Sequence, residues 1–123
     1  MIALLDTSVV LAPLPSPLPD ETAVSVITMA ELRTGVLVSP NASERARRLE
    51  LLAQLERTYS PLPVDDDVAR AYATIIATER ERGRRPRAMD ALIAATALSR
   101  GLTLYTRDEN LAKIGVVDAR LVR

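Results

Sequence analysis

Four carboxylates, Asp6, Glu31, Asp90 and Asp108, lie where a predicted strand ends or a predicted helix begins. Asp6 and Asp108 each follow an apolar run, Glu31 lies at the start of the helix expected after the second strand, and Asp90 opens an alanine-rich helix. The carboxyl ends of parallel strands are where α/β proteins bind ligands. Four acids meeting there would repel one another unless a divalent cation neutralised them. The chemistry that such a cluster supports is metal-assisted hydrolysis of a phosphodiester bond.

The residue types that are missing narrow this chemistry further. The chain contains no cysteine and no histidine, which excludes thiol nucleophiles, serine–histidine triads, histidine bases and the usual zinc sites. Any metal must be held by oxygen atoms, and such ligands favour Mg²⁺ or Mn²⁺. Because no side chain is a good general base at neutral pH, the nucleophile must be water activated by that metal.

Three of the acids also have a purely structural interpretation. Glu31 completes a capping box with Thr28, in which its carboxylate would bond the Thr28 amide. Asp108 is suited to be a helix N-cap. Asp90 could be satisfied by the dipole of its own helix or by Arg87 three residues earlier. We favour a functional role for Asp90, because an ionised carboxylate on an apolar helix face needs a partner.

The elements that must position these acids alternate between strands and helices. We expect strands at 2–5, 22–28 and 102–105, short strands within 60–64 and 116–122, and helices at 29–38, 41–59, 65–82, 88–100 and 108–114. Asn41 and either Asp65 or Asp66 are the expected caps of the two long helices. Four prolines between Pro13 and Pro19 indicate an extended connection rather than a helix. This alternation predicts a three-layer α/β/α fold with a central parallel sheet.

Length and composition fit one soluble domain spanning residues 1–123. No apolar stretch approaches the roughly 20 residues needed to cross a bilayer, and the N-terminus lacks the basic region of a signal peptide. We therefore expect a cytoplasmic protein that does not enter a membrane. The net charge is zero, yet fifteen of the sixteen basic residues are arginine, the side chain that matches phosphate geometry. With 2% aromatic residues, base stacking can contribute little to binding.

Four segments of the chain, DTSVV, MAEL, MDALIAATA and LYTRDENL, together resemble the PIN domains. The similarity is strongest to the toxin half of bacterial VapBC toxin–antitoxin pairs and covers nearly the whole chain. It implies that Asp6, Glu31, Asp90 and Asp108 bind Mg²⁺ or Mn²⁺ and cleave RNA, with Thr106 as the small polar residue beside the fourth acid. It also implies a homodimer and a small antitoxin whose tail blocks the site.

The resemblance and the residues together predict a metal-dependent endoribonuclease. Asp6 and Asp90 are the expected metal ligands, completed by Glu31 and Asp108 directly or through water. The candidate substrate contacts are the hydroxyls that accompany the acids and the arginines of a basic turn: Ser8, Thr106, Arg84, Arg85 and Arg87. The arginines could equally form a solvated turn. Residues 12–21 depart from the family, which usually has a helix or two there.

Three other functions were weighed. A signalling receiver domain would need a second acid beside Asp6, where Thr7 stands, and a lysine after a late strand, whereas Lys113 lies in a predicted helix. A haloacid-dehalogenase-type phosphatase would need an aspartate in place of Ser8. The alternative that stays open is a catalytically idle PIN-like fold that binds protein or RNA.

Overall fold

One parallel sheet forms the centre of the computed structural model, which describes residues 2–11 and 18–122. Its strands are β1 (Ile2–Leu5), β2 (Glu21–Ala23), β3 (Thr103–Thr106) and β4 (Ala119–Leu121). They lie in the order β2-β1-β3-β4, and every neighbouring pair is parallel. The expected parallel sheet is therefore confirmed, with β1 in its interior.

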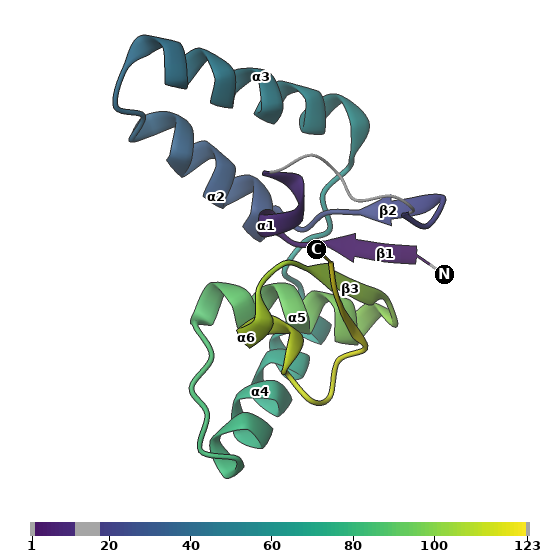
Figure 1. Cartoon of the computed structure of the whole chain (residues 1–123). Helices are drawn as coiled ribbons and strands as arrows, with labels where there is room; N and C mark the ends of the chain where they lie inside the picture. The colour runs from purple at the N-terminus through teal and green to yellow at the C-terminus, as the bar shows by residue number, and fades with distance from the viewer. Residues whose placement is uncertain (1, 12–17, 123) are drawn as a thin grey trace.

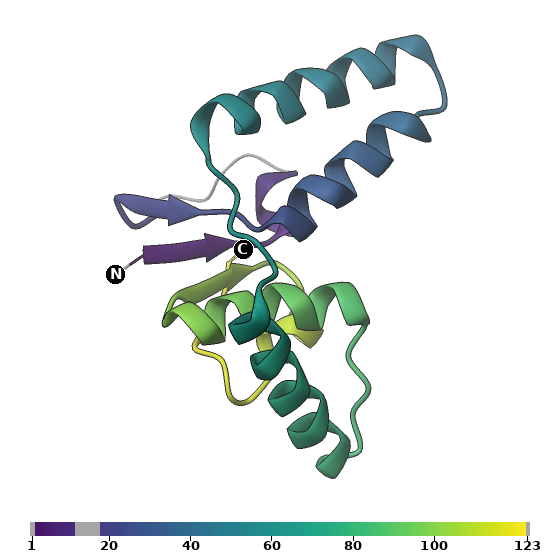
Figure 2. The same cartoon turned by 180° about the vertical axis from the view of Figure 1, so that it is seen from behind.

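Helices cover both faces of the sheet and make three layers. They are α1 (Thr7–Val10), α2 (Val26–Leu37), α3 (Ala42–Thr58), α4 (Asp66–Glu81), α5 (Ala88–Arg100) and α6 (Glu109–Ala112). The first three lie on one face and the last three on the other (Figure 1). The segment between α3 and α4 carries the chain from one face to the other (Figure 2). No helix of the described residues is long and apolar enough to span a membrane.

The continuous apolar run of β1 is explained by burial on both faces. Ala3 and Leu5 belong to the core beneath α1, α2 and α3, whereas Leu4 points the other way, into the core beneath α4, α5 and α6. None of the three exposes more than 1% of its surface. Alternate residues of a strand point to opposite faces, so a strand between two helical layers has no polar face.

The strand predicted over 22–28 is wrong beyond Ala23. Ser25 instead caps α2, because its hydroxyl accepts a hydrogen bond from the Thr28 amide at 3.3 Å. The β-branched residues after Ser25 therefore form the first turn of a helix, despite their preference for strands. Thr28 is not the cap, so the proposed capping box with Glu31 is also wrong.

The caps of the two long helices are as predicted. Asn41 accepts from the Glu44 amide at 2.8 Å, and Asp65 accepts from the Val68 amide at 3.0 Å. Gly101, at φ 65°, ends α5 in the left-handed conformation that glycine adopts without strain.

The strand expected within 60–64 also differs, because it is reduced to a single bridge between Leu62 and Ser25. The extended proline-rich connection falls largely on residues 12–17, outside the described part of the chain.

Candidate active site

Asp6 lies at the carboxyl end of β1 and caps α1, a short helix that the sequence did not indicate. Its Oδ1 accepts hydrogen bonds from Ser8 Oγ at 2.6 Å and from the Val9 amide at 3.1 Å, while Thr106 Oγ1 donates to Oδ2 at 2.6 Å. The residue is only 3% exposed. A buried carboxylate needs such partners, and three donors hold this one in a fixed orientation.

Burial raises the pKa of Asp6 above its ordinary value of 3.8. The hydrogen bonds from Ser8, Thr106 and Val9 oppose this shift, and the negative charge of Asp90 adds to it. Asp90 is therefore close enough for its charge to act on Asp6. A positive charge placed between these two carboxylates would offset the desolvation of Asp6 and the repulsion between Asp6 and Asp90.

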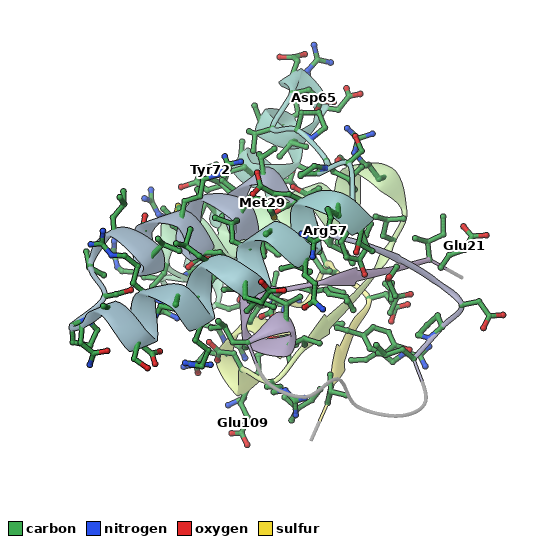
Figure 3. The ribbon with its side chains drawn as sticks, turned by 90° about the horizontal axis from the view of Figure 1, so that it is seen from above. Glu21, Met29, Arg57, Asp65, Tyr72 and Glu109 are labelled. Carbon is green, nitrogen blue, oxygen red and sulfur yellow. The ribbon has the colours of Figure 1, made fainter. Side chains whose placement is uncertain are left out.

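Asp108 is connected to the same position through the end of β3. Its amide donates to Thr106 Oγ1 at 3.0 Å, and its own Oδ1 caps α6 by accepting from the Asn110 amide at 2.8 Å. The N-cap interpretation of Asp108 is thus correct, and it leaves Oδ2 available for another partner. The neighbouring Glu109 points outward, away from the fold (Figure 3).

Glu31 reaches this region from α2. Thr7 Oγ1 donates to Glu31 Oε1 at 2.6 Å and lies 3.1 Å from Thr28 Oγ1. Thr7 directly follows Asp6, so its hydroxyl ties Glu31 to the end of β1. Sequence reasoning gave Thr7 no role, although its position beside the first acid was the available signal.

Asp90 and Asp108 are bridged by one arginine. Arg87 Nε donates to Asp90 Oδ2 at 3.1 Å, and Arg87 Nη2 lies 3.6 Å from Asp108 Oδ2. The ion pair between Arg87 and Asp90 was one of the structural alternatives raised for Asp90. The contact with Asp108 was not foreseen, because it joins the starts of two helices, α5 and α6.

Three of the four acids border two separate cavities, and Asp6 lines neither of them. One, of about 520 Å³, is lined by the basic turn, α4, α5 and α6: Glu79, Arg84, Arg85, Pro86, Arg87, Asp90, Asp108, Asn110, Leu111, Lys113 and Ile114. The other, of about 390 Å³, lies against α1, α2 and α3 and is lined by Thr7, Leu11, Glu31, Leu32, Gly35, Arg47, Arg48 and Leu51. The predicted arginines therefore share a cavity with two of the acids. Arg47 and Arg48 of α3 line the second cavity beside Glu31, and both form ion pairs with Glu44.

The basic turn is anchored by a buried acid, Glu79, which is 2% exposed. Its carboxylate lies 3.6 Å from the guanidinium groups of both Arg82 and Arg84. Arg84 also donates to the Lys113 carbonyl at 2.8 Å. Arg82 packs across Gly115, where a Cβ atom would come within 1.9 Å of its Nη1. Arg84 is thus held by the fold, while Arg85 and Arg87 remain on the cavity wall.

The oxygen-rich residues fit Mg²⁺ or Mn²⁺ in donor type. Asp90 and Asp108 already contact a single cationic group, and Asp6 senses the charge of Asp90. Within residues 2–11 and 18–122, however, no three acidic side chains are grouped as a ready-made metal site. A divalent ion would therefore have to draw the carboxylates closer together.

The sheet order and the helical layers on both of its faces are those of a PIN fold. The PIN domain family matches residues 3–117, and the chain belongs to it. The curated relatives include "Ribonuclease VapC5" of Mycobacterium tuberculosis, 41% identical over 107 residues, which are 86% of this chain and 78% of the relative. "Toxin FitB" of Neisseria gonorrhoeae is 37% identical and covers 85% of this chain and 86% of its own.

Solved structures agree with this assignment. A member of the VapBC family of toxin–antitoxin systems, VapBC-5 from M. tuberculosis, superposes with a TM-score of 0.89 at 41% identity, covering 99% of this chain and 98% of that one. The structure of FitAcB from N. gonorrhoeae gives a TM-score of 0.81 at 34% identity, covering 97% and 96%. Both similarities extend over nearly all of this chain.

Proposed function

We propose that this protein is the toxin of a type II toxin–antitoxin system and that it hydrolyses RNA as a metal-dependent endoribonuclease. Relatives named as ribonucleases and as a toxin support this function. The observation that carries it is the environment of Asp6, a buried carboxylate of raised pKa at the end of the central strand. A group in that state favours an added cation.

Asp6 and Asp90 would hold the metal, with Glu31 and Asp108 completing the site directly or through water. When bound, Mg²⁺ or Mn²⁺ supplies Lewis-acid activation of water and stabilises negative charge on the phosphate. Ser8 and Thr106 keep the two oxygens of Asp6 oriented, and Thr7 holds Glu31 toward the same strand end. The donors recorded for Asp6 among the described residues are neutral groups, so they leave its negative charge uncompensated for a cation.

Arg85 and Arg87 are the proposed contacts to the RNA backbone. Both line the cavity that contains Asp90 and Asp108, so a phosphate held there would lie beside the acids. Arg84 contributes by holding the turn in place through Glu79 and the Lys113 carbonyl. A local group of arginines can in this way bind a polyanion although the whole chain is neutral.

We further propose a small cognate antitoxin as partner, since the structures of similar proteins are named as toxin–antitoxin assemblies. A homodimer and action in the cytoplasm complete the proposal. Each is expected from the family and is testable by purification of the chain together with the product of a neighbouring gene.

Cleavage of structured RNAs, followed on gels with Mn²⁺ or with EDTA, tests the activity. Wild type should cut in Mn²⁺ and not in EDTA, and Asp90→Asn should not cut in either. Cleavage that persists in EDTA, or equal cleavage by Asp90→Asn, would overturn the proposal. RNA that is bound and left intact in Mn²⁺ would instead identify a PIN fold that acts as a binding module.

A further inference from the structure

Arg87 is the residue immediately before α5, and its side chain is 78% exposed. Its side chain makes no capping hydrogen bond to the backbone amides at the start of that helix. Its guanidinium instead contacts Oδ2 of Asp90 and Oδ2 of Asp108. The guanidinium therefore lies beside two opposite charges, although most of the side chain is open to solvent.

A divalent cation bound between Asp90 and Asp108 would take the place of Arg87 as the positive group beside these two carboxylates. Two positive groups cannot share the same pair of carboxylate oxygens without strong repulsion at such short range. The guanidinium and the metal therefore compete. Exposed ion pairs are weak, so Arg87 can be released when another anion is offered to it.

Phosphate is the anion that suits the released arginine. The guanidinium binds phosphate through two parallel donors, and the cavity wall beside it carries Arg85 and Lys113 as further positive groups. Arg84, by contrast, is held by Glu79 and by the Lys113 carbonyl. Within this turn, Arg84 is held in place by the fold, whereas the Arg87 side chain is held by exposed ion pairs.

We propose that Arg87 is an internal counter-cation: it neutralises Asp90 and Asp108 in the metal-free protein and leaves them for an RNA phosphate. Metal and RNA then bind with positive coupling, because each removes an obstacle to the other. This inference rests on the proposed nuclease function. It assigns Arg87 a positioning role, which differs from simple attraction of RNA.

The first test is Mn²⁺ binding without RNA, measured from the paramagnetic resonance signal of free Mn²⁺. Arg87→Gln should bind Mn²⁺ at least about fivefold more tightly than wild type, because the competing cation is gone. The matched control is Arg85→Gln, which removes the same charge from the same cavity wall, where no described contact joins Arg85 to Asp90 or Asp108. The control should stay within about twofold of wild type. Equal changes in both variants, or no gain in Arg87→Gln, would overturn the inference.

The second test adds a mixed-sequence single-stranded DNA oligonucleotide as a phosphodiester probe that lacks 2′-hydroxyls. After subtraction of the Mn²⁺ that the oligonucleotide binds by itself, wild type should bind Mn²⁺ more tightly with the oligonucleotide than without it. Arg87→Gln should show no such increase. Equal tightening in both proteins would contradict the coupling. A wild type that neither binds Mn²⁺ nor cuts RNA would reject the proposed function. A wild type that does both, with an Arg87→Gln variant that binds Mn²⁺ no more tightly, would reject this inference alone.

Discussion

Thr106 and Asp6 are separated by 100 residues in the sequence, and Thr106 Oγ1 donates a hydrogen bond of 2.6 Å to Asp6 Oδ2. The bond joins the carboxyl ends of two neighbouring strands, β1 and β3. The same hydroxyl oxygen accepts from the Asp108 amide at 3.0 Å. One small side chain therefore orients one candidate acid and positions the backbone of another.

Removing that hydroxyl should be costly. Thr106→Val keeps the shape of the side chain but leaves a buried carboxylate without one donor, so the free energy of unfolding should fall by about 1–3 kcal/mol. Thr103→Val, on the same strand, is the control because Thr103 donates to Asp118, whose carboxylate is exposed to water. Urea unfolding of both variants measures the difference. Equal losses would show that the bond to Asp6 has no special weight.

Stability should depend on pH through Asp6. Because its folded-state pKa is raised above the ordinary 3.8, the folded protein holds more protons than the unfolded chain between those two values. The free energy of unfolding therefore gains a contribution as pH falls through that window. Asp6→Asn lacks this contribution. The free energy of unfolding of wild type should therefore increase relative to that of the variant as pH is lowered from 7 toward 4 in EDTA. A difference that is constant with pH, or that shrinks, would contradict the assignment.

A divalent metal should stabilise the wild-type protein, and this stabilisation should depend on Asp90. In thermal melts, Mn²⁺ should raise the melting temperature of wild type by mass action and that of Asp90→Asn much less. RNA cleavage by the variant should fall by about a hundredfold or more, as when a transition-state contact is lost. Asp67→Asn, at an exposed acid in the first turn of α4, should behave as wild type. An Asp67→Asn variant as impaired as Asp90→Asn would indicate a general charge effect.

Loss of the acid and loss of the arginines in the cluster of Glu79, Arg82 and Arg84 should change the free energy of unfolding by different amounts. Replacing both Arg82 and Arg84 by glutamine leaves Glu79 buried without a counter-charge and should cost about 3 kcal/mol or more. Glu79→Met leaves two arginines that are nearly half exposed and that water can solvate, so it should cost less. Chemical denaturation compares the two proteins. A larger loss for Glu79→Met would mean that the carboxylate, and not its partners, holds the turn.

Expression in bacteria should reveal the toxin. Induction of wild type without an antitoxin should arrest growth, whereas Asp6→Asn should permit it at a matched level of soluble protein. The control is co-expression with the cognate antitoxin, which should restore growth. Harmless accumulation of soluble wild-type protein that cuts RNA in vitro would contradict the toxin role.

The elements that the sequence predicts best are those with local signals. Asn41 before α3, Asp65 before α4 and Gly101 after α5 each act within a turn of the helix that they bound. The strand predicted over residues 24–28 is wrong because the strand preference of its β-branched residues competes there with the Ser25 cap, and the cap prevails.

In the candidate site, too, features with a local sequence signal could be predicted and contacts between distant segments could not. The parallel sheet that places Asp6 and Asp108 at neighbouring strand ends could be predicted from alternating strands and helices. The bond from Thr7 to Glu31 and the bridge from Arg87 to Asp108 could not. Both contacts join segments that come together only in the folded chain, so no local spacing records them.

The interior position of β1 also determines when its pairing with β3 can form during translation. β1 is made first, but one of its neighbours, β3, follows about 100 residues later. At about 5–20 residues per second, the nascent chain must wait about 5–20 s before Asp6 can meet Thr106. Pairing across such a span is also intrinsically slow. The candidate site therefore remains incomplete while the early segments of the chain emerge from the ribosome, because Asp6 still lacks its partner from β3.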